Sequence, residues 1–170
     1  MKRILTIDEK NYDPKLPELR REAVRGIIFI DSKMLLVESG FGEVKLPGGG
    51  VEDGEDDLQA LTREVREETG YTLLPESVKP FGEILERRMS THEEMIWNQL
   101  SRIYTCSVSS QRGKCHFTAN EQKYGFRCIC LSLDEAIQKN HEMLAREGTL
   151  PWNQREYQTL LIIKKTLTSH

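Results

Sequence analysis

Residues 49–71 read GGVEDGEDDLQALTREVREETGY and decide the fold class of this chain. The middle of the stretch has the apolar spacing of a helix, and a glycine near its end is typical of a helix C-terminus. We therefore expect a helix over residues 55–69. Glu64, Glu67 and Glu68 crowd together on it, and like charges at this spacing cost roughly 0.2–0.5 kcal/mol per pair. Such a cluster of carboxylates needs a physical explanation.

The three carboxylates lie at the edge of the packing face of this helix. At 100° per residue, Glu67 lies at about −60° and Glu68 at about +40° from Glu64. The apolar side chains Leu61 and Val65 fall beside this acidic stripe, not opposite it. Glu67 and Glu68 also lie at the C-terminal end of the helix, where the helix dipole opposes negative charge. This position favours a cation site over an ordinary solvated face.

A glycine-rich loop, GFGEVKLPGGG at residues 40–50, precedes the helix. Glycines allow the main chain to approach a ligand closely. Carboxylates together with loop carbonyls form a site of hard oxygen ligands, which Mg²⁺ or Mn²⁺ prefers. Residues 48–70 hold eight acids and two bases, about −6 by count, within a chain of net charge −3. A solvated charged face, with Arg63 pairing Glu67, is the alternative.

Composition is typical of a soluble globular protein, with 170 residues, 38% hydrophobic and 30% charged. The small net charge gives no strong attraction to nucleic acid or anionic lipid. The N-terminus has no apolar signal region, and no apolar run is long enough to span a membrane. The four cysteines lack zinc-ligand spacing. We expect free thiols in a reducing cytoplasm, with a redox or metal role as the alternative.

The remaining pattern predicts one α/β domain over residues 1–170, with its core at about 20–146. We expect an irregular lead-in over residues 1–20. The pattern further predicts a hairpin from 23–30 and 34–39, strands at 81–88, 100–108 and 124–132, and helices at 133–146 and 152–167. The last helix has the apolar spacing Leu160, Ile163 and Leu167 on one face.

The 49–71 segment resembles the signature of the Nudix hydrolases, here called the Nudix box. The signature is glycine, five residues, glutamate, seven residues, Arg-Glu, an apolar residue, any residue, Glu-Glu, any residue, glycine and an apolar residue. The matching positions are Gly49, Glu55, Arg63, Glu64, Val65, Glu67, Glu68, Gly70 and Tyr71. The tyrosine is a mild departure, because the last position is more often aliphatic. The resemblance implies an α/β/α sandwich with a mixed sheet that hydrolyses, with divalent metal, a diphosphate linked to another group.

The resemblance also implies roles for individual residues. It places the metal on four groups: Glu64, Glu67, Glu68 and the carbonyl of Gly48. Arg63 would orient a glutamate, and Glu55 would support the metal site from further out. The general base would be a glutamate of the box or a later one, for which Glu121 is the best candidate. The alternative for Glu121 is a solvated loop acid.

The substrate side is less specified. Arg87, Arg88 and Trp97 lie in the segment 87–99, which we expect to form a loop over the acidic end of the helix. Such residues hold phosphate and a flat ring, although each also suits an ordinary structural role. They predict a small nucleoside diphosphate derivative as partner, with no nucleic-acid polymer and no membrane.

Other functions stay open at this point. Sequence marks of the ADP-ribose, dinucleoside polyphosphate and NADH hydrolases of the family are absent, which disfavours those substrates. A catalytically silent nucleotide-binding or regulatory module is the leading alternative to an enzyme. No sequence feature supports an isomerase on this fold, and the choice between monomer and homodimer is open.

Overall fold

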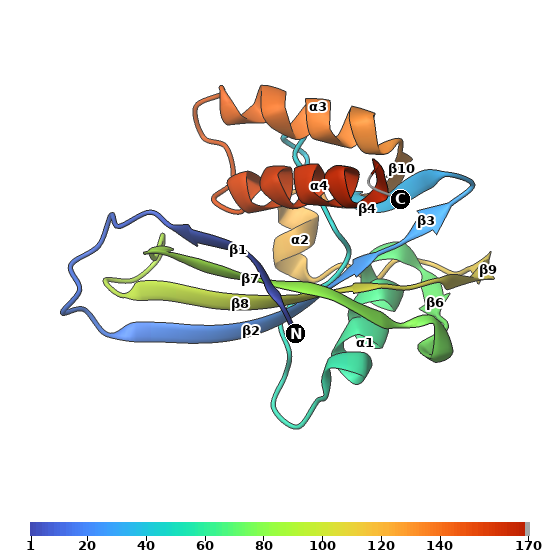
Figure 1. Cartoon of the computed structure of the whole chain (residues 1–170), viewed down its shortest axis with the longest axis horizontal. Helices are drawn as coiled ribbons and strands as arrows, with labels where there is room; N and C mark the ends of the chain where they lie inside the picture. Colours follow the sequence, from blue (N-terminus) through green and yellow to red (C-terminus); the bar gives the residue numbers. More distant parts are fainter. Residues whose placement is uncertain (169–170) are drawn as a thin grey trace.

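The computed structural model of the chain describes residues 1–168, in which helices flank a group of strands (Figure 1). The strands are β1 (Arg3–Asp8), β2 (Glu18–Ile27), β3 (Phe29–Ile30), β4 (Lys33–Glu38), β5 (Val44–Lys45), β6 (Tyr71–Leu73), β7 (Lys79–Met89), β8 (Ile96–Thr105), β9 (Val108–Arg112) and β10 (Arg127–Leu131). The helices are α1 (Asp57–Thr69), α2 (Ala119–Lys123), α3 (Leu133–Leu144) and α4 (Asn153–Thr168), with a short 3₁₀ turn η1 (Pro75–Ser77).

The largest sheet is mixed, as predicted. Its strand order is β1-β7-β8-β2. The central pair β7 and β8 is antiparallel, whereas β1 pairs with β7 and β2 pairs with β8 in parallel. A second sheet joins β10, β4 and β3, with β5 added to β4, and a third consists of β6 and β9.

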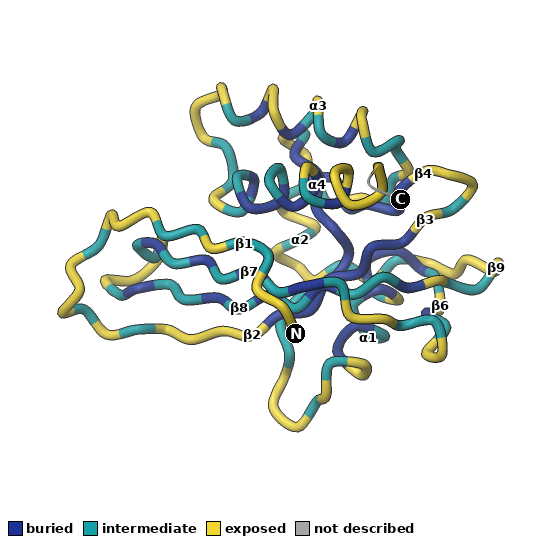
Figure 2. The backbone as a smooth tube through the Cα atoms, in the orientation of Figure 1, coloured by how far each residue is buried: buried dark blue, intermediate teal, exposed yellow. Residues whose placement is uncertain are grey.

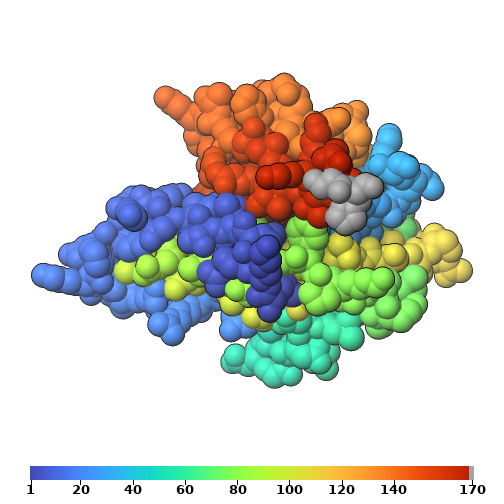
Figure 3. Space-filling model, in the orientation of Figure 1, coloured from blue at the N-terminus to red at the C-terminus, as the bar shows by residue number. Residues whose placement is uncertain are grey.

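Helices cover the sheets from two sides, which confirms the predicted α/β/α sandwich. Successive residues of β4 show why: Leu36 belongs to an apolar cluster with Ile163 of α4, whereas Leu35 belongs to a second cluster with Leu61 and Val65 of α1. This alternation follows from the two-residue period of a strand. The buried backbone lies between the layers (Figure 2), and the surface shows α1 in teal opposite α3 and α4 in orange and red (Figure 3).

The predicted hairpin and the later helices are confirmed. Strands β3 and β4 pair as an antiparallel hairpin around Asp31 and Ser32, which both have positive φ. In α4, Leu160 and Ile163 are buried, but Leu167 is 55% exposed. Leu167 lies in the last turn of α4, beyond the core. No helix of the described residues is long and apolar enough to cross a membrane.

The predicted irregular lead-in over residues 1–20 is wrong. Strand β1 lies at residues 3–8, and β2 begins at residue 18. Both strands find their partners far along the chain, in β7 and β8. A local pattern gives no signal for such parallel pairing, because its hydrogen bonds come from distant residues.

Candidate active site

Helix α1 is defined at both ends by local hydrogen bonds. Asp56 caps its N-terminus by accepting a hydrogen bond from the Gln59 N–H at 2.8 Å, and the Gln59 side chain accepts in turn from the Asp56 N–H. The helix ends at Gly70, whose φ of 76° suits glycine and whose N–H donates to the Arg66 carbonyl at 2.9 Å. The helix therefore forms where the sequence predicts it, two residues later at its start.

The buried face of α1 turns two of its glutamates toward a tight loop. Leu61 and Val65 are fully buried in the cluster beneath the helix. Leu58, which has a similar spacing, is 39% exposed. With the helix held in this rotation, Glu64 and Glu68 are stacked one turn apart and both contact the loop that we call the glycine loop, residues 46–50.

Two glycines let the glycine loop pass between β2 and α1. A Cβ built on Gly48 would lie 2.1 Å from the Val24 carbonyl oxygen, and Gly48 has a φ of 137°. A Cβ on Gly49 would lie 2.3–2.6 Å from the carboxylate atoms of Glu64. Any larger residue would push the loop away from β2 or from the carboxylate. Positions 48 and 49 of the loop therefore require glycine.

Glu68 is a buried and fully paired carboxylate, 1% exposed. Its Oε1 accepts a hydrogen bond from Lys45 Nζ at 2.6 Å, and its Oε2 accepts from the Gly48 N–H at 2.7 Å. Burial raises the pKa of Glu68, while the charges of Lys45 and Arg25 act in the opposite direction. Sequence reasoning missed Lys45, although it lies immediately before the glycine loop.

Arg63 joins the remaining parts of the site. Its Nε donates to Glu55 Oε1 at 2.8 Å, its Nη1 to Glu64 Oε1 at 2.7 Å, and its Nη2 to the Gly50 carbonyl at 3.0 Å. The hydrogen bond from Arg63 and a second one from the Glu52 N–H lower the pKa of Glu55 to about 2. Arg63 itself stays protonated, because these carboxylates raise its pKa. Such contacts orient carboxylates and leave little of Arg63 for a substrate.

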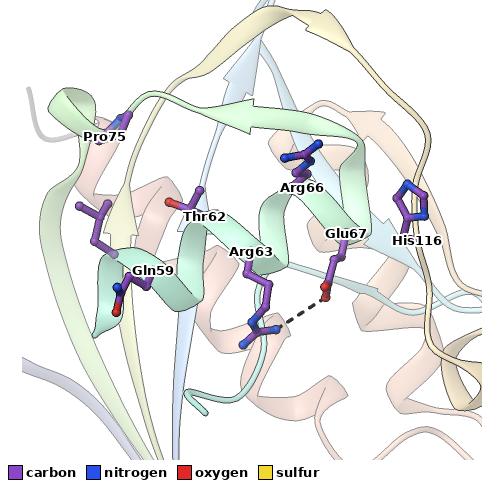
Figure 4. A pocket seen from close by; sticks show the side chains of 8 residues that line it. Gln59, Thr62, Arg63, Arg66, Glu67, Pro75 and His116 are labelled. Carbon is purple, nitrogen blue, oxygen red and sulfur yellow. Dashed lines mark ion pairs between the residues drawn. The ribbon is translucent and has the colours of Figure 1, made fainter. Parts of the chain in front are cut away.

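Glu67 lies apart from Glu64 and Glu68. Its side chain is 42% exposed and 3.6 Å from Arg63 Nη1 (Figure 4). It lines a cavity of about 740 Å³ on the outer side of α1, together with Arg66, His116 and Pro75. Neither Glu64 nor Glu68 lines this cavity. The two neighbouring glutamates of the box therefore face different surroundings.

The described part of the chain holds no group of three His, Cys, Asp or Glu side chains converging as a metal site. The donors that do meet are chemically suitable for a divalent ion. Glu64 and Glu68 contact consecutive glycines of the loop, and carboxylate and carbonyl oxygens are the ligands that Mg²⁺ prefers. In this structure, basic side chains bind two of these donors. Lys45 binds Glu68, and Arg25 donates a hydrogen bond to the Gly48 carbonyl. Glu64, Glu68 and the Gly48 carbonyl are therefore suitable ligands for a divalent metal ion if the Lys45 ammonium leaves Glu68.

The predicted substrate residues are on strands and divide between two faces of the sheet. Arg88 pairs in register with Trp97, and its guanidinium lies 5.1 Å from the indole centroid. Arg21 lies over the same indole at 5.5 Å and close to Gly50 of the glycine loop. Arg87 points to the opposite face, where it pairs with Glu18 at 3.1 Å.

The predicted loop over 87–99 is therefore wrong. Strand β7 continues to residue 89 and β8 begins at residue 96, so only residues 90–95 connect them. Because neighbouring residues of a strand alternate in direction, Arg87 and Arg88 cannot act on one ligand. Arg21 was missed because β2 itself begins earlier than predicted.

Glu121 has a local structural contact. It is the third residue of α2, and its Oε2 accepts hydrogen bonds from the Thr118 N–H at 2.8 Å and the Thr118 hydroxyl at 2.9 Å. Three residues after α2, the ring of Phe126 lies 5.0 Å from Lys45 Nζ. The α2 segment thus borders the site through Phe126, while the Glu121 carboxylate caps its own helix.

Comparison with known proteins finds relatives named for activity on nucleotides. The nucleoside triphosphatase NudI of Escherichia fergusonii is 36% identical over 90 residues, which are 52% of this chain and 62% of that protein. The putative ADP-ribose pyrophosphatase YjhB of Bacillus subtilis is 26% identical over 102 residues, 59% of this chain and 48% of that protein. The chain thus matches about half of the length of these relatives.

Solved structures show the same fold. A NUDIX hydrolase from Nitrosomonas europaea has a TM-score of 0.54 and 24% identity, covering 83% of this chain and 90% of that one. An ADP compounds hydrolase has a TM-score of 0.54 and 17% identity, and the match covers 88% of this chain and 74% of that one. The family model for the NUDIX domain matches residues 19–150. With the box on α1 and the mixed sheet between helices, this match shows that the chain belongs to the NUDIX family.

Proposed function

We propose that the protein is a divalent-metal-dependent hydrolase that cleaves the pyrophosphate bond of a nucleoside diphosphate linked to another group. Nucleoside triphosphates fall within this class. The observation that carries the proposal is the contact of Glu64 and Glu68 with Gly49 and Gly48 of one loop. Relatives named nucleoside triphosphatase and putative ADP-ribose pyrophosphatase support it.

Nudix hydrolases generally use a divalent metal, and we propose Mg²⁺ or Mn²⁺ here. Glu64, Glu68 and the Gly48 carbonyl would hold it, with Glu67 reaching in from its more exposed position. Such an ion neutralises diphosphate charge and lowers the pKa of a bound water. Arg63 would keep the Glu64 carboxylate in place through the 2.7 Å hydrogen bond between them.

For the general base we favour a glutamate of the box over Glu121. The Glu121 carboxylate already accepts two hydrogen bonds from Thr118 and would have to leave them to reach a water molecule. Glu67 is half-exposed and is bound only loosely, at 3.6 Å from Arg63. A group that takes a proton needs such access to the attacking water.

The nucleotide base would bind on the sheet face that carries Arg21, Arg88 and Trp97. The indole of Trp97 is partly exposed with Arg21 and Arg88 over it, and Arg21 connects this face to the glycine loop. Stacking on an aromatic ring contributes about 1–3 kcal/mol per base. Arg87 has no part in this proposal, because it lies on the other face. All four cysteines are free thiols, and we propose the cytoplasm as the compartment.

A substrate panel that detects the two products, a nucleoside monophosphate and either pyrophosphate or the phosphorylated second group, tests the proposal. We expect turnover of nucleoside triphosphates or nucleoside diphosphate derivatives with Mg²⁺, and better turnover of these than of sugar- or inositol-linked diphosphates. Trp97→Leu should raise KM more than it lowers kcat, because stacking binds ground state and transition state alike. Glu64→Gln should lower the rate by roughly a thousandfold.

Two results would contradict this. Equal or better turnover of the non-nucleotide diphosphates would remove the stacking role of Trp97. Tight nucleotide binding with no turnover under any divalent metal would favour the silent binding module. Arg87→Leu is the matched control for Trp97→Leu, since it changes the neighbouring strand on the opposite face and should leave KM unchanged.

A further inference from the structure

Two of the proposed metal ligands already carry a cation of the protein. Lys45 Nζ lies 2.6 Å from Glu68 Oε1, and Arg25 Nη1 donates to the Gly48 carbonyl. Both basic residues are buried, with Lys45 8% and Arg25 7% exposed. A metal ion bound at Glu68 and Gly48 would therefore meet two positive charges.

Arg25 and Lys45 differ in their freedom to move. Arg25 lies beneath the glycine loop, enclosed by protein, and its Nε has no hydrogen-bond partner within the described residues. A carbonyl oxygen has two lone pairs, so the Gly48 oxygen can serve Arg25 and a metal at the same time. Lys45 instead carries its ammonium on a flexible stem, and Nζ lies 5.0 Å from the centroid of the Phe126 ring. The ammonium therefore already lies over the face of that ring while it binds Glu68, and the ring can hold it when Glu68 releases it.

We propose that Lys45 is an internal counter-ion that takes the place of the metal at Glu68 in the metal-free protein, and that metal binding displaces its ammonium from Glu68 toward Phe126. The inference rests on the proposed function, since it assumes that Glu68 binds metal. A carboxylate buried as deeply as Glu68 is costly to keep ionised unless a cation lies beside it. An ammonium and a divalent ion on the same carboxylate repel each other, so one replaces the other.

The exchange makes two quantities depend on each other. Lys45 stabilises the fold without metal, and it weakens metal binding because the ion must first displace it. Removing the ammonium should therefore lower the melting temperature of the metal-free protein and tighten the binding of metal. A lysine that serves only to stabilise the fold would change the first quantity and leave the second unaltered.

The test measures Mn²⁺ binding by titration calorimetry and melting temperature with and without Mn²⁺, on the full chain. Lys45→Met keeps the length of the side chain and removes its charge. We expect its Mn²⁺ affinity to rise between about 5- and 150-fold, the usual range of coupling between two sites. Its metal-free melting temperature should fall, and saturating Mn²⁺ should raise it by more than in the wild-type protein.

A matched control separates displacement from the general loss of a positive charge. Arg66 is on α1, two residues before Glu68, and is exposed at the outer cavity, which His116 also lines. Arg66→Met should change Mn²⁺ affinity by less than about twofold, because solvent and salt screen an exposed charge. Lys45→Gln, which keeps a neutral donor toward Glu68, should shift both quantities in the same direction as Lys45→Met by smaller amounts, and is the variant to use if Lys45→Met does not fold.

NMR of the Lys45 ammonium in the wild-type protein tests displacement without any variant. The protected Nζ signal of metal-free protein should shift and lose its protection from solvent exchange at saturating Mg²⁺. An unchanged Nζ signal, or Lys45→Met affinity equal to or weaker than wild type, would overturn the exchange while leaving the proposed function in place. A wild-type protein that binds no Mn²⁺ would overturn both.

Discussion

Glu67 and Glu68 are neighbours in the sequence but lie in different surroundings. Glu68 is buried against Lys45 and Gly48, whereas Glu67 is 42% exposed near Arg63. The 100° turn between successive residues of a helix places them on different sides. The repulsion expected within the acidic cluster is thus relieved by basic side chains of the protein itself. Metal would add to this relief, or replace part of it.

The pH dependence of stability provides a test at a single residue. The pKa of Glu55 falls from 4.5 to about 2, first because of its hydrogen bond from Arg63 and then because of the Glu52 N–H. A lowered pKa means that the ionised Glu55 stabilises the fold above about pH 4.5, and that this stabilisation is lost as the pH falls through 2. We expect Glu55→Gln to lower the urea midpoint at about pH 7 and to match wild type near about pH 2.

Asp53→Asn is the control for that comparison, because Asp53 is an exposed acid in the same loop. It should leave the urea midpoint nearly unchanged at both pH values. A Glu55→Gln deficit of the same size at low and neutral pH would show that the carboxylate charge contributes nothing through Arg63.

At the scale of elements, the end of α1 also fixes the chain that follows it. Gly70 closes the helix, and its carbonyl accepts a hydrogen bond from the Gly113 N–H at 2.7 Å. The Arg112 Nε donates to the Thr69 carbonyl at 3.0 Å. Helix end, β6 and the segment after β9 are therefore held together at one point. The position of the glutamates on α1 depends on these hydrogen bonds between the end of α1 and residues 112–113.

Gly70→Ala tests the close packing of the helix end against Gly113. A Cβ there would lie 2.3 Å from the Gly113 carbonyl oxygen, and φ is 76°. Gly54 has a similar φ of 84° but nothing within 4 Å of its Cβ position, so Gly54→Ala measures backbone strain alone, about 1–2 kcal/mol. We expect Gly70→Ala to cost at least about 1 kcal/mol more in urea denaturation. Equal losses of unfolding free energy at the two positions would show that the segment after β9 moves to make room for the Cβ at no cost.

At the scale of the whole molecule, a buried ionic network joins α4 to the sheet and to the glycine loop. Arg155 of α4 lies 2.6 Å from Glu86 of β7 and 3.0 Å from the neighbouring Glu156. Glu156 Oε2 accepts from the Leu46 N–H, the first residue of the glycine loop, at 3.0 Å. All three charged side chains are at most 5% exposed. The glycine loop, which contacts Glu64, is therefore held in part by α4.

Arg155→Met should be strongly destabilising. It leaves the buried Glu156 without its cation and leaves Glu86 with Arg88 as its remaining partner. Breaking one side of a buried ion pair costs about 3–5 kcal/mol. The free energy of unfolding from urea titration measures the loss. Arg3→Met, which removes a partly exposed pair with Glu83, should cost about 1 kcal/mol or less. A loss below about 1 kcal/mol for Arg155→Met would mean that water reaches the network.

The sequence by itself determined the elements whose cause is local. Helix α1 follows from its apolar spacing and from a glycine at its end, and the β3–β4 hairpin follows from two strand patterns around a tight turn. The Nudix box could be identified for the same reason, since its residues are fixed by spacing along one helix and the segments that adjoin it. The candidate ligands Glu64 and Glu68 belong to this part.

Only the tertiary structure decided which residues meet from distant positions. The parallel pairing of β1 and β2 depends on β7 and β8, so the local pattern of residues 1–20 missed β1 and the start of β2. The separation of Arg87 from Arg88 depends on where β7 ends. The contact of Lys45 with Glu68 requires the glycine loop to pack on α1. In each case the deciding interaction joins residues far apart in sequence, and no local preference encodes such an interaction.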